Sequence, residues 1–518
     1  MNKPAFTVLD NSNIVESYPG ITLPLTCSFI RIAYRGVVGG LVSANLKNET
    51  ILAKYEDSLA NMITSYQGRV YYCINNWYLL IDLMPFSKRI TPVWQDMMGV
   101  KNTEIYLGRL HDFTFGQKAK MYANMLRNAL HIPRDMERLE QSFADVVAHF
   151  EKAYNEDLSI LELLGLFHEI EHRALDKWYV TLANDLHAFL WTGLLKRKLR
   201  KKGVDVTGYI SGITSLESLK PLKALLHIAR EYGDEKDLLS KQEVKDYIKM
   251  FGDRGPCELK LETMSYREDH KRLEEQVREF AKDKARLDER ISGFQQQEMS
   301  QEKGGFIAKR ARLGIKNREI SRLNRSRIYG MVRRLFLSIG NRLYQDGYID
   351  EQFDVFYLEF QEIESGDYGL FRELVAKRKA EYEEYEKLPA RSRLVFRGDK
   401  LIDEKTEASW TGEFTGIGTS QGSVTAEAVV VESPNERVDV TGKIIITKTT
   451  DPGWVFLLAM AKGIVAEKGS LLSHTAIVSR ELRIPAVVAV ENATSVIKTG
   501  DIVKVDGNLG KVEIVQAN

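Results

Sequence analysis

The sequence predicts a multidomain α+β protein in which a mainly α-helical domain is followed by a compact α/β domain. The chain has 518 residues, too many for the single hydrophobic core that about 100 to 200 residues usually share. Apolar residues recur at helical spacing up to about residue 386, and short β-branched runs punctuated by glycine follow from about residue 415. We therefore expect a helical domain over 1–386, a linker over 387–414 and an α/β domain over 415–518.

The composition is that of an ordinary globular protein. Hydrophobic residues make up 44% of the chain and charged residues 28%, which excludes a disordered, collagen-like or fibrous protein. Lys plus Arg number 73 and Asp plus Glu number 72, so the net charge of +1 gives no overall attraction to nucleic acid or to an anionic membrane. Any such preference has to be local.

The cysteines and the N-terminal residues indicate the cytoplasm. Cys27, Cys73 and Cys257 lie far apart and form no C-x-x-C pair, so neither a disulfide framework nor a thiolate zinc site is expected. Residues 1–20 lack the charged-then-apolar pattern of a signal peptide, and no stretch approaches about 18 uncharged apolar residues. We expect a cytoplasmic protein that does not bind membranes.

Helical patterns dominate the first 386 residues. Leu, Ile, Phe and Trp recur at helical spacing from about 146 to 199, which predicts one long or two stacked buried helices. Charged residues dominate from 264 to 288, and we expect a solvent-exposed helical arm over about 260–300. A third helical stretch covers roughly 317–344.

Strand patterns begin after a polar segment. Residues 387–414 are charged and lack sustained periodicity, as is typical of a linker. The β-branched runs beyond it are AVVV (428–431), KIIIT (443–447), GIVA (463–466), AVVAV (486–490), IVKV (502–505) and VEIV (512–515). They predict a compact α/β domain of about 100 residues.

One histidine of this last domain is placed for chemistry. The run GIVAE is followed by a glycine turn at Gly469 and Ser470, and then by SHTAIVSREL, whose apolar residues have helical spacing. His474 therefore lies where a loop enters a helix N-terminus, and the N–H groups and helix dipole there stabilise a phosphoryl group on the ring. The same field keeps the ring neutral and nucleophilic near pH 7. The alternative is an ordinary histidine in a surface turn.

The residues around His474 favour the chemical interpretation. The stretch GSLLSHTAIVSRELRIPAVVAVENATSVIKTGDIVKVDGNLGKVEIV resembles the phosphohistidine swivelling domain of the phosphoenolpyruvate-utilising enzymes. GIGTSQGSVTAEAVVV and GKIIITKTTDPGWVFLLAMAKGIVAEKG resemble the earlier part of that domain, so the resemblance covers about 416–515. Ser470 and Leu472 depart from the commoner Gly and Thr of the family, whereas His474, Thr475 and Arg480 match it.

The resemblance implies a phosphoryl carrier. It implies that His474 carries the phosphoryl group between two sites and that Ser473, Thr475 and Arg480 bind that group. In the family an ATP-grasp domain charges the histidine. We find neither a glycine-rich phosphate-binding loop nor eight alternating strand and helix units, so we expect ATP and Mg²⁺ on a separate ATP-grasp partner.

The helical region resembles the acceptor-binding domain of the rifampin phosphotransferase branch. The similar pieces are ESYPGITLPLTCSF (16–29), FGDRGPCELKLETMSYRED (251–269), NREISRLNRSR (317–327) and GNRLYQDGYIDEQFDVFYLEFQEI (340–363). The resemblance implies that Arg318 and Arg322 lie near the acceptor hydroxyl and that Glu16 is a polar site residue. Arg254 and Glu258 are either acceptor-binding residues or a structural ion pair around a turn.

The spacing of the arginines agrees with this site. Between residues 303 and 334 the basic residues far outnumber the acids, of which Glu319 is the only one. Spacing of four puts Arg318 and Arg322 on one helix face, and guanidinium groups suit a phosphoryl group in transit. The alternatives are a solvated basic helix and a nucleic-acid patch, but the latter lacks interleaved aromatic residues.

A second histidine pattern lies in the helical region. His168 and His172 in HEIEH formally satisfy the H-E-x-x-H zinc-protease pattern on one helix face. No convincing third ligand or downstream signature accompanies them. We therefore read the pattern as a coincidence in a charged helix and expect no metal site.

Together these observations predict the phosphotransfer component of a split dikinase-type system. In this hypothesis His474 carries a phosphoryl group from a separate ATP-grasp protein to a small-molecule hydroxyl or enol acceptor bound in the helical domain. One alternative is a rifampin-type antibiotic kinase whose ATP domain was lost or lies outside this chain. The other is a non-catalytic binding or regulatory protein that keeps the fold without transfer.

Overall fold

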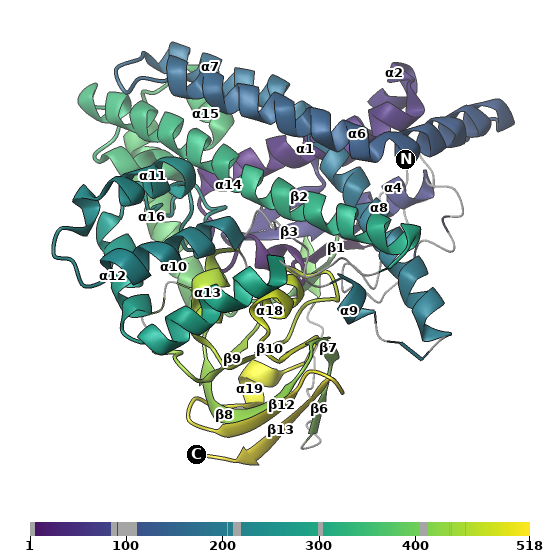
Figure 1. Cartoon of the computed structure of the whole chain (residues 1–518). Coiled ribbons are helices and arrows are strands. Elements are labelled where there is room, and N and C mark those ends of the chain that lie inside the picture. Colours follow the sequence, from purple (N-terminus) through teal and green to yellow (C-terminus); the bar gives the residue numbers. More distant parts are fainter. Residues whose placement is uncertain are drawn as a thin grey trace. The chain divides into compact units, whose positions relative to one another are not determined.

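The protein forms two compact units that do not follow the order of the sequence (Figure 1). The computed structural model describes residues 6–83, 87, 91, 111–201, 203–204, 206–210, 219–298, 304–402, 413–434, 436, 438–450 and 452–518. The first unit comprises Met1–Leu186, Lys260–Glu262 and Met331–Lys405, and the second comprises His187–Leu259, Thr263–Gly330 and Thr406–Asn518. The C-terminal α/β domain therefore shares a unit with part of the helical region.

The first unit is built mainly from helices. They are α1 (Pro24–Leu46), α2 (Glu49–Leu52), α3 (Glu56–Ala60), α4 (Ile74–Asp82), α6 (Phe115–Ala153), α7 (Ile160–Arg173), α15 (Phe360–Ser365), α16 (Phe371–Lys387) and the 3-10 helices η1 (Ile14–Glu16), η2 (Ala53–Tyr55), η3 (Leu175–Lys177) and η6 (Gln352–Tyr357). Helices α8 (Tyr179–Arg200) and α14 (Phe306–Gln345) each contribute residues to both units. The predicted helical run 146–199 therefore contains the end of α6, all of α7 and most of α8, because polar turns interrupt it.

A five-stranded antiparallel sheet in the first unit was not predicted. Its order is β2 (Ile63–Tyr66), β3 (Arg69–Cys73), β1 (Thr7–Asp10), β4 (Arg393–Arg397) and β5 (Lys400–Ile402). Strands β4 and β5 fall within the predicted linker 387–414, and β4 pairs with β1 so that Val395 lies opposite Val8. This part of the segment is folded, whereas 403–412 lie outside the described residues.

Among the described residues, one helix has the length and apolarity of a membrane span. It is α1, and 44% of its most apolar stretch is buried inside the structure. Leu25, Phe29 and Ile30 on α1 belong to the buried core. Buried core helices of globular proteins can have the same length and apolarity, so α1 is weak evidence for a membrane span. The expected absence of membrane binding stays a prediction.

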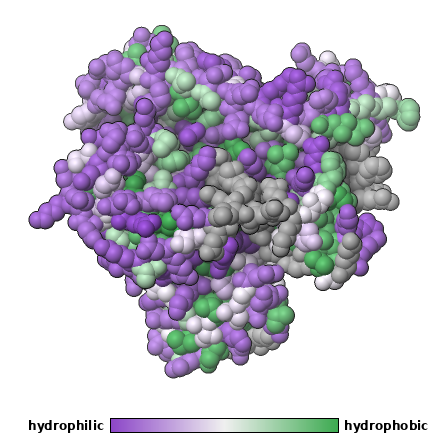
Figure 2. Space-filling view, in the orientation of Figure 1, coloured by the Kyte–Doolittle hydropathy of each residue, from purple (hydrophilic) through white to green (hydrophobic). Residues whose placement is uncertain are grey.

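Apolar side chains on the surface are scattered. Figure 2 shows a visible face that is mostly hydrophilic, with small hydrophobic patches. The first half of α6 carries several of the exposed ones, including Phe115, Leu126 and Leu130. Exposed apolar groups in small numbers are normal on protein surfaces, and we assign them no function.

Several helices that lie wholly in the second unit precede its sheet in the sequence. They are α9 (Thr207–Ile210), α10 (Lys220–Tyr232), α11 (Gln242–Phe251), α12 (His270–Ala281), α13 (Lys284–Glu298) and the 3-10 helix η5 (Leu238–Ser240). The charged segment 264–288 is not a solvent-exposed arm, because α12 and α13 bury Leu273, Val277, Leu287 and Ile291. The apolar residues lie on one face at helical spacing, and the charges cover the other faces.

The C-terminal domain contains a mixed sheet of eight strands. Its order is β6 (Glu413–Thr415), β13 (Lys511–Gln516), β12 (Ile502–Asp506), β8 (Ser423–Val430), β9 (Ile444–Thr447), β10 (Gly463–Ala466), β11 (Ala486–Val488) and β7 (Ile417–Ser420). Strands β8 to β11 are parallel, and the remaining pairs are antiparallel. All six predicted β-branched runs are confirmed as strands.

The two ends of this strand order are neighbours in sequence. Because β6 and β7 are joined only by Gly416, the sheet curls back on itself. The backbones pack closely there: a Cβ on Gly418 would lie 2.3 Å from the carbonyl oxygen of Gly507. The glycines of GIGTSQG therefore serve this close approach.

The parallel strands bury both of their faces. On one face Ile445 and Ile464 share a core with α17 (Val455–Met460) and α18 (His474–Leu482). On the other face Ile444 and Val465 share a core with α19 (Ala493–Val496) and the antiparallel strands. Continuous β-branched runs are expected of strands that are covered on both sides. The first of these faces carries the helix that begins at His474.

Candidate functional site

His474 is the first residue of α18, as the sequence predicts. The loop after β10 turns at Gly469, whose φ of +135° favours glycine and whose Cβ would lie 3.0 Å from Val488. Ser473 is the N-cap of α18: its Oγ accepts a hydrogen bond from the backbone N–H of Ala476 at 3.4 Å. The same hydroxyl donates to the carbonyl of Ser470 at 2.9 Å. Cap and loop together fix the position of the imidazole.

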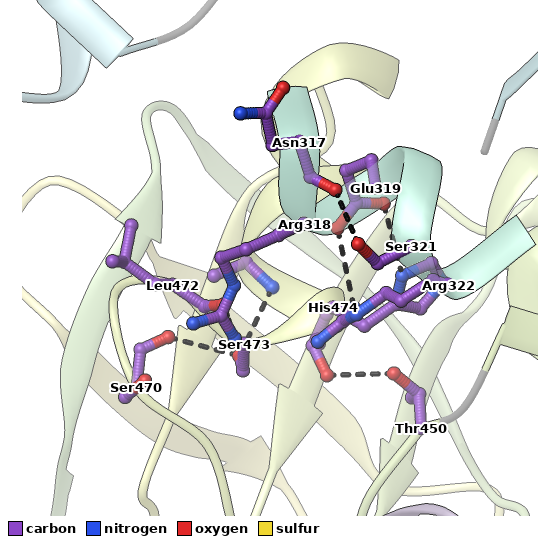
Figure 3. Close-up of polar contacts among 12 residues, drawn as sticks. Asn317, Arg318, Glu319, Ser321, Arg322, Thr450, Ser470, Leu472, Ser473 and His474 are labelled. Carbon is purple, nitrogen blue, oxygen red and sulfur yellow. Dashed lines mark hydrogen bonds and ion pairs between the residues drawn. The ribbon is translucent and has the colours of Figure 1, made fainter. Parts of the chain in front are cut away.

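The imidazole is buried and faces a carboxylate from α14. His474 is 2% exposed and Glu319 is 0% exposed. Glu319 Oε2 lies 3.8 Å from His474 Nδ1, beyond hydrogen-bond distance (Figure 3), and neither ring nitrogen has a hydrogen-bond partner among the described residues. A carboxylate opposite Nδ1 favours the tautomer that carries its proton there, which leaves the lone pair on Nε2. In this tautomer Nε2 is the ring nitrogen whose lone pair is available.

The charges around His474 keep its ring neutral. Burial lowers the pKa of His474 below its ordinary 6.5, because the imidazolium loses its hydration. The negative carboxylate of Glu319 opposes this shift of the pKa, whereas the positive charges of Arg322 and Arg254 add to it. The predicted neutral ring is supported, but burial contributes more than the helix terminus that the sequence suggested.

The two predicted arginines of α14 lie at this site. Arg318 Nη2 donates to the carbonyl of Leu472 at 3.5 Å, and its guanidinium lies 5.3 Å from the centre of the Phe189 ring. Arg322 Nη1 lies 3.5 Å from Glu319 Oε1. Figure 3 shows both side chains reaching toward the segment that carries His474. Guanidinium groups in this position can neutralise a phosphoryl group on the imidazole.

The other predicted residues of the C-terminal domain surround the loop. Thr475 Oγ1 hydrogen-bonds Thr450 Oγ1 at 2.7 Å. Arg480 Nη1 donates to the carbonyls of Leu471 at 2.9 Å and Thr419 at 3.4 Å, and its side chain is buried. In this conformation Arg480 therefore supports the loop that precedes His474. Phosphate binding by Ser473, Thr475 and Arg480 stays a prediction.

Arg254 and Glu258 form a buried ion pair within the second unit. Ser326 on α14 donates a hydrogen bond to the carboxylate of Glu258. This geometry supports the structural alternative, in which the pair fixes the turn after α11 against α14. The positive charge of Arg254 also lowers the pKa of His474.

Two sequence features lie in the first unit. Glu16 is the last residue of η1, and its role as an acceptor-binding residue stays a prediction. The histidines of HEIEH contact carboxylates: His168 Nδ1 and Nε2 each lie 3.0 Å from a carboxylate oxygen, of Glu171 and Glu364, and His172 Nδ1 lies 3.2 Å from Asp176. Within the part of the chain that the structure describes, no group of three or more potential ligands is arranged to hold a metal ion.

Sequence reasoning missed the role of Glu319. The signal was present, because Glu319 is the only acid in the basic segment 303–334 and stands next to Arg318. A single carboxylate among many basic residues is stabilised in its charged form and can pair with one specific group. Thr450 carried no such signal, since threonines are frequent in strand-flanking loops.

The comparisons with known proteins agree with the geometry of the C-terminal domain. Residues 439–510 match the mobile domain of PEP-utilising enzymes. The chain is 35% identical over 195 residues to the rifampicin phosphotransferase of Bacillus subtilis (strain 168), which covers 36% of this chain and 22% of that protein. It is 33% identical over 196 residues to that of Bacillus cereus, covering 36% of this chain and 23% of that protein.

A more distant relative matches along almost the whole chain. An uncharacterized protein of Mycobacterium tuberculosis (strain H37Rv) is 23% identical over 554 residues, which covers 99% of this chain and 62% of that protein. The matches to the two rifampicin phosphotransferases span less than a quarter of those proteins. Through residues 439–510, which include His474, this chain carries the mobile domain of the PEP-utilising enzyme family.

Proposed function

We propose that this protein is a phosphotransferase that carries a phosphoryl group on His474 Nε2. The observation that carries the proposal is the environment of that ring. It begins a helix, its Nδ1 faces Glu319 at 3.8 Å, and Nε2 has no hydrogen-bond partner among the described residues. A buried, neutral imidazole beside guanidinium groups suits a covalent phosphoryl carrier.

The reaction is proposed to proceed in two displacements. In the first, Nε2 attacks a phosphorus atom of ATP bound on a separate ATP-grasp protein, so a P–N bond forms and a P–O bond breaks. Mg²⁺ bound with the nucleotide would screen the charge of the phosphates. In the second, the oxygen of a small hydroxyl or enol acceptor attacks the phosphorus, the P–N bond breaks and Nε2 recovers its lone pair. The acceptor proton passes to a base that is not yet assigned.

The residues of α14 have separate tasks in this scheme. Glu319 holds the proton on Nδ1, and it stabilises the positive charge that develops on the ring when Nε2 is phosphorylated. Arg318 and Arg322 neutralise the phosphoryl oxygens during transfer to the acceptor. Because these groups come from α14, they act only while the C-terminal domain is docked on that helix.

The burial of His474 supports a moving domain. A side chain that is 2% exposed cannot be reached by a second protein. The C-terminal domain therefore has to separate from α14 for His474 to be charged, and it has to return for transfer.

Two alternatives to the split phosphotransferase follow from the sequence. The rifampicin phosphotransferases act on rifampicin by their name, and the same acceptor is a candidate for this chain. A non-catalytic protein that keeps the fold is the other alternative. We also propose a reducing, cytoplasmic setting, because Cys27, Cys73 and Cys257 are free thiols.

Labelling with a charging partner tests the proposal. An ATP-grasp protein that co-purifies with the chain would be mixed with it and with ATP labelled on each phosphate in turn. We expect label on the chain only when the partner is present. We also expect calorimetric titration of the chain alone with Mg-ATP to give no micromolar binding. Tight binding to the chain alone would overturn the split arrangement, and a partner that charges no residue would favour the non-catalytic alternative.

A further inference from the structure

Arginines of α12 and α13 bind the C-terminal domain through its backbone. Arg272 Nη2 donates to the carbonyl of Pro434 at 2.9 Å, and Arg286 Nη2 donates to the carbonyl of Ala461 at 3.0 Å. Arg290 donates to two carbonyls, those of Leu482 at 2.5 Å and Ala461 at 3.4 Å. All of these residues belong to the second unit.

The contacts of Arg290 fall at a mechanically important place. Leu482 is the last residue of α18, where backbone carbonyls lack helical partners and the helix dipole is negative. A guanidinium at this end satisfies a carbonyl and complements the dipole. The opposite end of the same nine-residue helix carries His474. Arg290 therefore fixes α18 from one end while α14 meets it at the other.

The interface around these arginine contacts combines an apolar core with a charged cleft. Leu287, Ile291 and Phe294 of α13 join the same apolar core as Leu482 and Ile484. Beside this contact runs a cleft of about 680 Å³, lined by side chains of both α12–α13 and the C-terminal domain. The charged residues of the cleft include Glu279, Lys282, Glu436 and Asp439. The helices and the C-terminal domain therefore share one continuous buried core, and the arginine contacts lie at its edge beside a charged, incompletely filled cleft.

Burial removes water from the guanidinium groups of Arg286 and Arg290, so these groups need hydrogen-bond acceptors in the folded protein. It lowers the pKa of Arg290 to about 10, which still leaves the group charged near pH 7. Its hydrogen bonds to the two carbonyls compensate for the lost hydration only while the domain is docked. Arg286, whose pKa burial also lowers, is in the same situation.

We propose that Arg286 and Arg290 form a latch that holds the C-terminal domain docked, with His474 facing Glu319. They are positioning residues, since they touch neither His474 nor Glu319 and act through the end of α18. The latch has to release for His474 to be charged and to close again for transfer. The docking role stands on the contacts alone, whereas the role in transfer rests on the proposed function.

Distance measurements on the isolated chain test the docking role. Spin labels would be placed on cysteines introduced at Lys245 on α11 and Glu513 on β13, both exposed, with Cys73→Ser to remove the most accessible native thiol. The distance distribution would be compared between this parent and the double variant Arg286→Met, Arg290→Met. Arg230→Met is the matched control, because the ion-pair partner of Arg230 is Asp288 on α13 rather than a group of the C-terminal domain.

We expect one dominant distance in the parent and in the control. In the double variant we expect a roughly tenfold fall in the ratio of this population to longer distances, because two charge-assisted hydrogen-bonding groups are lost. An unchanged distribution in a folded double variant would overturn the latch. If circular dichroism shows that the double variant does not fold, Arg290→Lys replaces it, because lysine keeps the charge but has fewer hydrogen-bond donors. The docked fraction of Arg290→Lys should be lower than that of the parent and of the control. A docked fraction equal to that of the parent contradicts the proposal.

Kinetics then separate the latch from the proposed function. With a charging partner, the double variant should be charged at the parent's rate or faster, while single-turnover transfer to acceptor should fall about as much as the docked population. A shift in distances without any charging of His474 by a partner would keep the latch and reject the phosphotransferase. Equal loss of charging and transfer with unchanged distances would assign the arginines to the fold alone.

Discussion

Glu319 Oε2 on α14 lies 3.8 Å from His474 Nδ1 at the start of α18, and both side chains are buried. The pair connects the helical part of the second unit to the only histidine that follows residue 387. A carboxylate in this position orients the imidazole and selects its tautomer. It therefore determines which ring nitrogen can act.

Replacing Glu319 with Gln tests this relationship. The amide can still accept a hydrogen bond from Nδ1–H, but it cannot stabilise a positive charge on the ring. We expect transfer from phosphorylated His474 to slow roughly tenfold to a hundredfold, or about 1.4 to 2.7 kcal/mol. A chase of labelled protein with acceptor measures this step, and Glu513→Gln on exposed β13 is the control. A transfer rate equal to that of the control would remove Glu319 from the mechanism.

Replacing His474 with Ala should abolish labelling by the charging partner. A phosphoimidazole is labile in acid and stable in base, in contrast to a phosphate on serine or threonine. The label on the parent chain should therefore disappear in mild acid and persist in base. Acid-stable label that survives His474→Ala would place the phosphoryl group on a hydroxyl residue and refute the carrier role.

Arg318→Met and Arg322→Met should separate the two displacements. Methionine keeps much of the apolar stem and removes the charge. We expect charging to be nearly unchanged and transfer to lose about 2 to 4 kcal/mol for each substitution, like removal of a preorganised electrostatic contact. Lys309→Met on the exposed part of α14 is the matched control. Unchanged transfer would return these arginines to the solvated basic helix considered from the sequence.

Acidification should weaken the folded, docked state through His474. Its folded pKa is lowered from 6.5, chiefly by burial, so the unfolded or undocked ring binds protons more readily between the folded pKa and 6.5. The contribution to stability is therefore present above about pH 6.5 and is lost as the pH falls toward the folded pKa. Urea unfolding between pH 7.5 and 5 measures it. Burial also lowers the pKa of His187, so only the difference between the parent and His474→Gln is attributable to His474.

An identical pH dependence in the parent and in His474→Gln would contradict this assignment. The charged groups that act on His474 are Glu319, Arg322 and Arg254. Because Glu319 raises the pKa of His474, Glu319→Gln should extend the loss of stability to lower pH. This second variant tests the sign of the interaction independently of any transfer assay.

Gly418→Ala should destabilise the C-terminal domain. A methyl group there would lie 2.3 Å from the carbonyl oxygen of Gly507, so one of the two backbones has to move. We expect a loss of about 1 to 3 kcal/mol in the free energy of unfolding, as for other overpacked sites. Gly165→Ala on α7 is the control, since nothing lies within 4 Å of the added methyl and a helical alanine is favourable. Equal stability of both variants would contradict the close approach of β7 to the 507–510 turn.

The fold of the C-terminal domain was predictable from the sequence, because its signals are local. The six β-branched runs became strands, and the turn before His474 became the start of a helix. Parallel strands covered on both faces need continuous apolar runs, which stand out in the sequence. The strands β1 to β5 were missed because they are short and mix polar with apolar residues. The β1–β4 pair, which joins the two hairpins β2–β3 and β4–β5 into one sheet, also spans more than three hundred residues and leaves no local signal.

The environment of the charged segment 264–288 was also not predictable from its local sequence. Its charges suggested an exposed arm, yet Leu273, Val277, Leu287 and Ile291 form a buried face. Composition reports the average of all faces of a helix, whereas packing depends on one face. Only the tertiary structure shows that Arg286 in this segment, and Arg290 just after it, contact the C-terminal domain.

The candidate site was visible in the sequence: a histidine at a helix N-terminus, followed by Thr475 and Arg480 in the pattern of the PEP-utilising mobile domain. It also indicated that Arg318 and Arg322 share a helix face. Only the tertiary structure shows that Glu319 faces Nδ1 and that His474 is buried. It also shows that Arg480 hydrogen-bonds the loop that precedes His474. Local sequence fixes helix starts and residue types, but burial and partner choice depend on segments more than a hundred residues apart, which meet only when the chain folds.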